Sequence, residues 1–152
     1  MNRSMTNLAT SANVATSANV DGIAAQSRRR TIVYWTSTLL LGTEGLVGGL
    51  LGIIRYRTYV GILAHLGYPL YFMTIIGVWY TLAGVAVLAP RFPRVKEWAY
   101  AGLLINYTGA AASHIAAADP FGALIAPTVF TSLTVASWAL RPPARRLAGP
   151  PL

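Results

Sequence analysis

TIVYWTSTLLLGTEGLVGGLLGII, residues 31–54, is the stretch that decides the fold of this chain. Apart from its tyrosine, its only ionisable side chain is Glu44. A helix needs about 20 residues to cross the hydrocarbon core of a bilayer, and this stretch is longer. The sequence therefore predicts a membrane-spanning helix here, and it raises the question of why a carboxylate stands in the middle of one.

Three further stretches have the same character: Tyr68–Ala89, Trp98–Ala118 and Phe121–Leu140. Each is bounded by charged residues or proline, and none shows the alternation of polar and apolar residues that is typical of strands. The fold class predicted from these stretches is all-α, a polytopic membrane protein whose four transmembrane helices form a compact bundle.

The composition supports lipid as the solvent for much of the chain. Only 11% of the 152 residues are charged and 55% are hydrophobic, whereas a soluble domain carries about 25% charged residues. The chain has no cysteine, which excludes disulfides, thiolate catalysis and cysteine-based metal sites.

The positive charges predict an orientation. Of the 12 lysines and arginines, all but Arg55 and Arg57 fall on one side of the predicted spans. Cytoplasmic loops are enriched in these residues, so both termini are expected in the cytoplasm and the protein in the inner (plasma) membrane. The same asymmetry explains the net charge of +8 without a nucleic-acid partner, and it implies attraction to anionic lipid headgroups.

The ends of the chain differ from its middle. Residues 1–30 are small and polar, and contain the repeat ATSANV at 9–14 and 15–20. So little apolar surface predicts a disordered cytoplasmic tail. Residues 31–141 form the predicted membrane domain, and 142–152 a cytoplasmic tail rich in proline and arginine.

Connections and small residues complete the predicted architecture. Residues 55–66 can form a short amphipathic helix at the membrane interface. Asp119 and Pro120 are expected to be the N-cap and the first residue of the fourth helix. Small residues let helices pack closely, and they occur as two GxxxG pairs on the first span and as a run on the third: Gly45 with Gly49, Gly48 with Gly52, and residues 109–112.

Several polar residues are expected inside the bundle. At 1.5 Å per residue from the cytoplasmic ends, Glu44 lies roughly 20 Å up, between Asn106 at roughly 12 Å and His114 at roughly 24 Å. Tyr80, at roughly 14 Å, is level with Asn106. One face of the third span can present Asn106, Ser113 and His114 to the interior.

Two interpretations of Glu44 remain open. In the first, it is protonated and holds helices together through a hydrogen bond, which is worth about 0.6–2 kcal/mol. In the second, Glu44 and His114 are catalytic groups that handle a proton or anchor a lipophilic ligand, because a carboxylate in a span costs about 2.5–3.5 kcal/mol and needs a partner. His65 can approach the same region, but no spacing motif predicts a metal site.

The motifs LGYP at 66–69, PRFPRVKEWAYAG at 90–102, TGAAASH at 108–114 and Asp119-Pro120 together resemble the DoxX-like family of small four-helix membrane proteins. The resemblance covers about residues 34–141. Relatives in that family include a subunit of an archaeal thiosulfate:quinone oxidoreductase and, more distantly, a chaperone for neuronal acetylcholine receptors. Similar members often carry lysine at the position of Tyr80 and aspartate at that of Asn106, so we hypothesise that a Tyr–Asn hydrogen bond replaces an ion pair here.

The sequence thus favours a membrane protein that binds a small, quinone-like lipophilic molecule, within a redox complex or alone. Catalytic residues would be Glu44 and His114, and ligand-binding residues would be Tyr80, Asn106, Ser113 and His65. Two alternatives remain: a non-catalytic assembly or chaperone-like subunit that holds a membrane-protein partner or a second copy, and a stand-alone acid–base enzyme. The sequence leaves the cofactor unknown.

Overall fold

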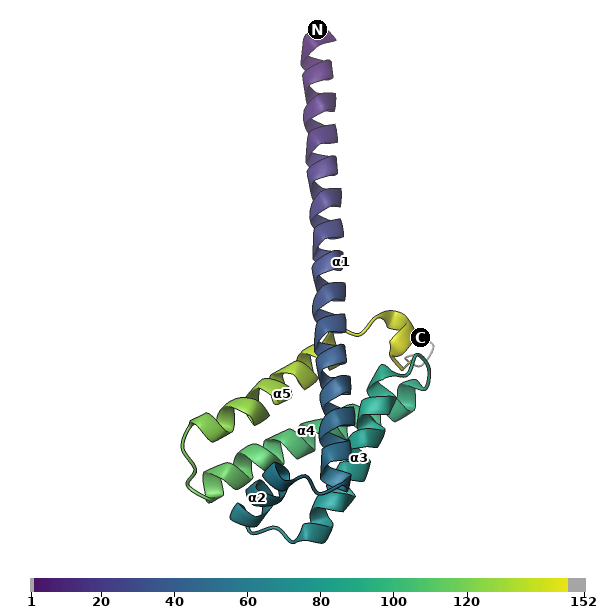
Figure 1. The fold of residues 1–152 in the computed structure, drawn as a ribbon. Helices are drawn as coiled ribbons and strands as arrows, with labels where there is room; N and C mark the ends of the chain where they lie inside the picture. The colour runs from purple at the N-terminus through teal and green to yellow at the C-terminus, as the bar shows by residue number, and fades with distance from the viewer. Residues whose placement is uncertain (1, 148–152) are drawn as a thin grey trace.

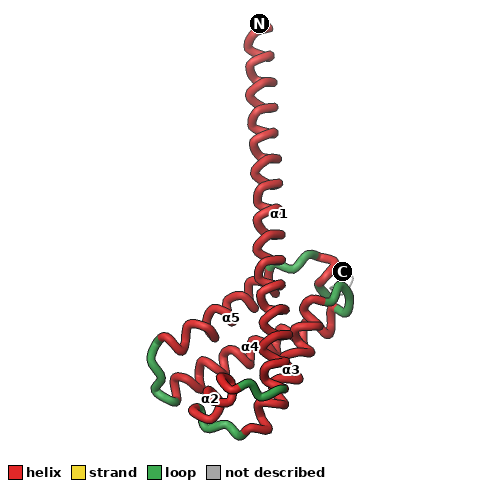
Figure 2. Tube along the Cα trace, in the orientation of Figure 1, coloured by secondary structure: helices red, strands yellow, loops and turns green. Residues whose placement is uncertain are grey.

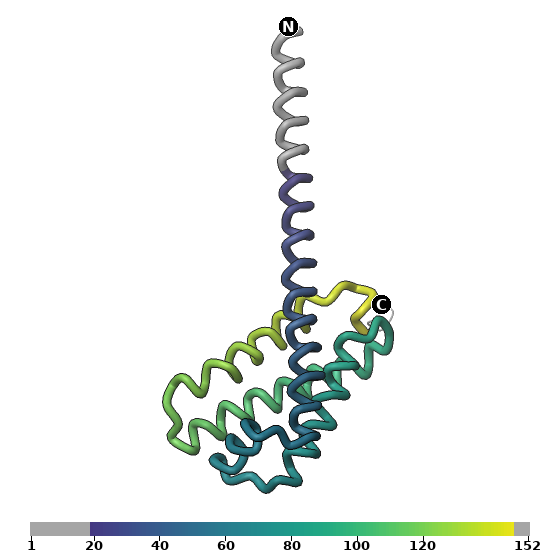
Figure 3. The backbone as a smooth tube through the Cα atoms, in the orientation of Figure 1, coloured from purple at the N-terminus to yellow at the C-terminus, as the bar shows by residue number. Residues whose placement is uncertain are grey.

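The computed structural model describes the backbone of residues 2–147 and the side chains of residues 19–147, the part coloured in Figure 3. Within these residues the chain is all-helical, as Figure 2 shows, which confirms the predicted α class. The elements, in chain order, are α1 (Asn2–Ile53), α2 (Arg57–His65), α3 (Leu70–Leu88), α4 (Pro93–Ala116), α5 (Gly122–Ala139) and the short 3-10 helix η1 (Pro143–Arg145).

Helix α1 is far longer than the predicted span. It runs without a break from Asn2 to Ile53 and projects out of the rest of the molecule (Figure 1). A disordered tail was expected at 1–30, but the described part of this segment is helical. All side chains from Asn19 to Arg30 are exposed, so local propensity rather than packing maintains the helix there. Residues 1 and 148–152 of the two predicted tails lie outside the described residues.

The remainder of α1 packs with α3, α4 and α5 into what we call the body. Helix α1 contacts α3 and α5, and α4 contacts α3 and α5, so each of the four helices has two neighbours in the body. The core between them is apolar and aromatic, and its largest buried residues are Leu41, Val87, Tyr100, Leu103 and Tyr107. The short helix α2, expected from residues 55–66, is present and lies against the start of α3.

Glycines let α1 and α3 touch backbone to backbone. A Cβ on Gly77 of α3 would lie 2.8 Å from the Gly49 carbonyl oxygen, and one on Gly84 would lie 3.0 Å from the Gly42 carbonyl oxygen. Gly45 and Gly52 of α1 meet α3 in the same way. A Cβ on Gly45 would lie 3.0 Å, and one on Gly52 3.2 Å, from a glycine Cα atom of α3. The predicted role of the small residues on the first span is therefore confirmed.

Three of the described helical segments are long and apolar enough to cross a membrane: Asn19–Ile53, Leu70–Leu88 and Gly122–Ala139. Helix α4 is long enough but less apolar, since it carries Lys96, Glu97 and Asn106. The body also exposes large apolar side chains, such as Trp79 (68% exposed) and Ile105 (72% exposed). Apolar surface of this kind fits a lipid environment, and the four-span topology stays a prediction.

The connection between α4 and α5 differs from the prediction. Helix α5 begins at Gly122, and its N-terminus has no side-chain cap. The predicted N-cap role of Asp119 and the helical start at Pro120 were therefore wrong. The carboxylate of Asp119 is engaged elsewhere, with two histidines, and this arrangement shapes the candidate site.

Candidate functional site

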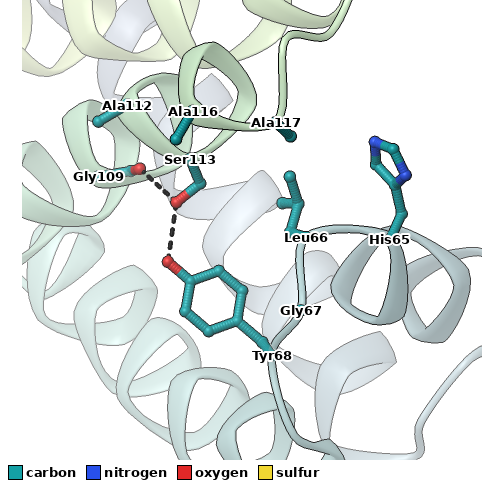
Figure 4. A pocket seen from close by; sticks show the side chains of 9 residues that line it. All are labelled: His65, Leu66, Gly67, Tyr68, Gly109, Ala112, Ser113, Ala116 and Ala117. Atoms are coloured by element: carbon teal, nitrogen blue, oxygen red, sulfur yellow. Dashed lines mark hydrogen bonds between the residues drawn. The ribbon is translucent and has the colours of Figure 1, made fainter.

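A hollow opens at the end of the body where α2 lies, which we call the α2 end (Figure 4). It has a volume of about 590 Å³. Its walls come from the end of α2, the turn that leads into α3 and the last turns of α4. The lining residues are His65, Leu66, Gly67, Tyr68, Gly109, Ala112, Ser113, Ala116 and Ala117. Most of these walls are small or apolar.

Two hydroxyl groups meet inside the hollow. The Tyr68 hydroxyl lies 2.8 Å from Ser113 Oγ, and Ser113 Oγ donates to the Gly109 carbonyl oxygen at 2.9 Å (Figure 4). With the Ser113 proton directed at that carbonyl, Tyr68 is the donor to Ser113. Rotation of the Tyr68 hydroxyl hydrogen would free this donor for a ligand, for example for a carbonyl oxygen.

Beside the hollow, Asp119 bridges two histidines. His65 Nε2 lies 2.6 Å from Asp119 Oδ1, and His114 Nδ1 lies 2.7 Å from Oδ2. Hydrogen bonds from His114 and then His65 hold the pKa of Asp119 below its usual range. The carboxylate thus sets which nitrogen of each ring faces Asp119: Nε2 of His65 and Nδ1 of His114.

Two helix ends of the same type bring these residues together. At the end of α2, Gly67 adopts φ +80° and the Tyr68 N–H bonds back to the Leu63 carbonyl. At the end of α4, Ala118 adopts φ 56° and the Asp119 N–H bonds back to the His114 carbonyl. Such left-handed terminations fold the chain back over the last helical turn, which places Asp119 beside His114.

Glu44 lies in the middle of the body and has a different partner from those expected. The Tyr107 hydroxyl of α4 donates to Glu44 Oε2 at 2.8 Å. Tyr107 is buried, its ring meets that of Tyr80 edge to face at 5.7 Å, and it stacks on Phe130 at 5.3 Å. Glu44 is thus directed toward the third predicted span, as expected, but through a tyrosine.

The structure brings some of the predicted site residues together and separates others. Ser113 and His65 line one hollow, and His114 joins His65 through Asp119. Glu44 and His114 bond to different residues, so they do not form a direct pair. Within the described residues, no hydrogen bond joins Tyr80 to Asn106. Tyr107, one residue or about 100° further round α4, occupies the position facing α1 and α3.

Sequence reasoning missed three residues of these arrangements: Tyr68, Tyr107 and Asp119. Asp119 follows His114 by five residues, a spacing that a left-handed helix end brings into contact, but alanine at position 118 gives no signal for such an end. In the described part of the chain, no group of three His, Cys, Asp or Glu residues is arranged to hold a metal ion.

Comparison with known proteins identifies a family. The model of the DoxX-like family matches residues 36–137, about two thirds of the chain, which confirms the resemblance seen in the sequence motifs. Among curated proteins and solved structures, no significant match was found.

Proposed function

Since the chain belongs to the DoxX-like family, we propose that this membrane protein binds a small, quinone-like lipophilic molecule in the hollow at its α2 end. In this proposal α1, α3, α4 and α5 form a four-helix transmembrane bundle in the inner (plasma) membrane. Both termini lie in the cytoplasm, because nearly all lysines and arginines stand on that side. The hollow then faces the outer leaflet, from which a lipophilic molecule can enter.

The observation that carries the proposal is the Tyr68–Ser113 hydroxyl pair inside a hollow whose other lining residues, apart from His65, are small or apolar. Binding sites for small molecules combine an apolar lining with a few placed polar groups. A ligand with an apolar ring and a carbonyl oxygen matches both parts. His114 and His65, held by Asp119 at the rim, would give or take the proton that accompanies reduction of such a carbonyl.

Glu44 has a structural role in this proposal. It is only half-buried, and its bond to Tyr107 links α1 to α4, which is the first of the two interpretations above. Tyr80 and Asn106 stay near this link rather than at the hollow. A redox complex would have to supply the electrons, since reduction of a quinone consumes two electrons and no residue that lines the hollow is a two-electron donor.

The test is binding of a short-chain benzoquinone to the full-length protein in detergent, measured by calorimetry. Ser113→Ala should strengthen binding by up to about fivefold, because it removes the acceptor with which the ligand carbonyl competes for the Tyr68 hydroxyl, a hydrogen bond of about 1 kcal/mol. Ser132→Ala is the matched control, because Ser132 also donates to the carbonyl four residues earlier, that of Thr128, but lies on exposed α5 surface.

Tyr68→Phe gives a second measurement with little risk to the fold, since the ring keeps its stack on Phe72 at 4.9 Å. Tyr68→Phe should weaken binding about fivefold, because it removes the hydroxyl that donates to the ligand carbonyl. Equal affinity of the wild type, Ser113→Ala and Tyr68→Phe would contradict the proposal, as would the absence of binding by the wild type.

An assembly subunit is the second candidate function. The exposed stretch of α1 from Asn19 to Arg30 favours it, because that stretch has no neighbour in the described chain and offers a helix to a partner. Removal of residues 2–30 should then abolish co-purification of a membrane partner and leave quinone binding unchanged. Loss of quinone binding alone would contradict this candidate.

A further inference from the structure

A cluster of cations lies at the other end of the body, beside the α3–α4 turn and the C-terminal segment (Figure 1). We call Lys96, Arg141, Arg145 and Arg146 the basic cluster. One carboxylate accompanies it among the described residues: Glu97 Oε1 lies 2.8 Å from Arg141 Nη1, and Glu97 Oε2 accepts from the Trp138 indole at 2.9 Å. Four cations therefore share a single acidic side chain.

Backbone carbonyls at helix C-termini offset part of the remaining charge. Lys96 Nζ donates to the Ala86 and Val87 carbonyls of α3, both at 2.7 Å. Arg146 donates to the Ala139 and Arg141 carbonyls at the end of α5. A helix C-terminus carries about half a negative charge. Counted over the described residues, two such ends and Glu97 leave roughly two positive charges of the cluster without compensation.

Burial makes this surplus costly. Lys96 is 1% exposed and Arg141 is 4% exposed. Burial and the nearby charges of Arg145 and Arg141 lower the pKa of Lys96, which precedes the span predicted at 98–118, to about 8. Arg141 Nη1 is close to Glu97 but lacks hydrogen-bond geometry with any described residue. We regard this contact as an attraction of charges and not as a directed bond.

Aromatic side chains of the type enriched at the depth of lipid headgroups lie beside the cluster. The Arg145 guanidinium lies 4.7 Å from the centre of the half-exposed Trp35 ring, and Arg141 lies 5.6 Å from that of Trp138. Tryptophan is enriched where membrane helices meet the headgroup layer. Arg145 uses one nitrogen, Nη1, to donate to the Tyr34 hydroxyl at 3.2 Å; within residues 19–147 its other guanidinium donors have no side-chain or backbone acceptor and can serve a ligand.

We propose that the basic cluster binds the phosphate of an anionic phospholipid from the leaflet at this end of the body. Arg145 and Arg146 contact the phosphate directly, because they are the less buried members. Lys96 and Arg141 are buried behind them and attract the phosphate through their positive charge without contacting it. The acyl chains of the lipid lie along the exposed apolar surface of the body. Basic pockets between membrane helices are suited to such headgroups, and this site is independent of the hollow at the α2 end.

The experiment measures thermal unfolding of the full-length protein in neutral detergent with added phosphatidylglycerol or phosphatidylcholine. We expect phosphatidylglycerol to raise the Tm by several degrees, as a ligand of the folded state must, and phosphatidylcholine to leave it unchanged. Arg145→Gln should remove most of the rise. Arg57→Gln, which deletes an exposed cation at the α2 end, is the matched control and should keep it.

Three outcomes would overturn the proposal. Equal rises in Tm with the two lipids would show that the negative charge of the headgroup is not recognised. If Arg57→Gln reduced the rise as much as Arg145→Gln, the effect would be a general attraction between charges. A rise of the same size with inorganic phosphate would indicate an ion site without a lipid. If Arg145→Gln does not fold, Arg146→Gln provides the same comparison, and an undiminished rise there contradicts the proposal.

Discussion

The glycines of α1 and those of α4 differ sharply in what surrounds them. A Cβ on Gly49 of α1 would come within 2.8 Å of backbone on α3, whereas one on Gly102 or Gly109 of α4 would meet nothing within 4 Å. Both helices looked equally rich in small residues, yet only one uses them for close contact. On α4 the small side chains instead leave room, and near Gly109 that room is the hollow.

This difference separates the body into a tight side and an open side. The tight side joins α1 to α3 by backbone contact and to α4 through Glu44 and Tyr107. The open side joins α2 and the turn that follows it to α4 and the segment that follows α4, through the contacts of His65 with Asp119 and of Tyr68 with Ser113. Rigid contacts fix the helices, and the open side is accessible to a ligand.

The largest expected effect is on the tight side. Gly77→Ala places a Cβ 2.8 Å from the Gly49 carbonyl oxygen, and backbone cannot move aside easily. We expect a loss of about 3 kcal/mol in the free energy of unfolding, the upper part of the range for overpacking, measured by denaturant titration in detergent. Gly102→Ala is the control and should be neutral or stabilising. Similar losses in both variants would refute the distinction.

Tyr107→Phe tests the side-chain link between α1 and α4. The ring remains, but Glu44 loses the hydroxyl donor of Tyr107, so we expect a loss of about 1.5 kcal/mol in the free energy of unfolding, the upper end of the range for a single hydrogen bond. The same unfolding titration measures it. Tyr71→Phe is the matched control, since Tyr71 is 64% exposed, and should change stability by less than about 0.5 kcal/mol. A Tyr107→Phe protein as stable as the control would show that the link is not structural.

Ala118→Gly should have a smaller and opposite effect on the open side. Ala118 stands at φ 56°, a conformation that costs an ordinary residue about 1 kcal/mol and glycine very little. We expect a gain of about 1 kcal/mol, read from the denaturant midpoint. An unchanged or lower midpoint would mean that the helix end is not strained.

The smallest effect concerns pH. The pKa of Asp119 is lowered in the folded protein, so the ionised carboxylate stabilises the fold above the ordinary aspartate pKa of about 3.9, and this contribution disappears as pH falls through the lowered value. The Tm difference between wild type and Asp119→Asn should therefore be present at pH 7 and shrink below about pH 4. A difference that is constant down to pH 3 would contradict the assignment of the His–Asp contacts.

Much of the fold could be predicted from the sequence, because span length, charge and motif order are local signals. Helices α2, α3 and α5 lie near the predicted ranges, whereas α1 starts far earlier than the predicted span and α4 starts at Pro93, since proline suits the first turn of a helix. Partners within the site were less predictable. To predict that Tyr107 and not Asn106 is the partner of Glu44, one must know how α4 is rotated about its own axis. Residue spacing gives that rotation only to within one position. Predicting the contact of Asp119 with His114 would have required knowing that Ala118 adopts a left-handed conformation.

The unbroken course of α1 has a mechanical consequence. With no kink between Asn19 and Thr31, the exposed stretch and the part within the body move as a single rod. The exposed stretch adds a lever of roughly 18 Å, so a tilt of about 10° in the body would displace its tip by roughly 3 Å. A spectroscopic label attached at Asp21 would therefore report, from outside the body, on motions of the helix that carries Glu44.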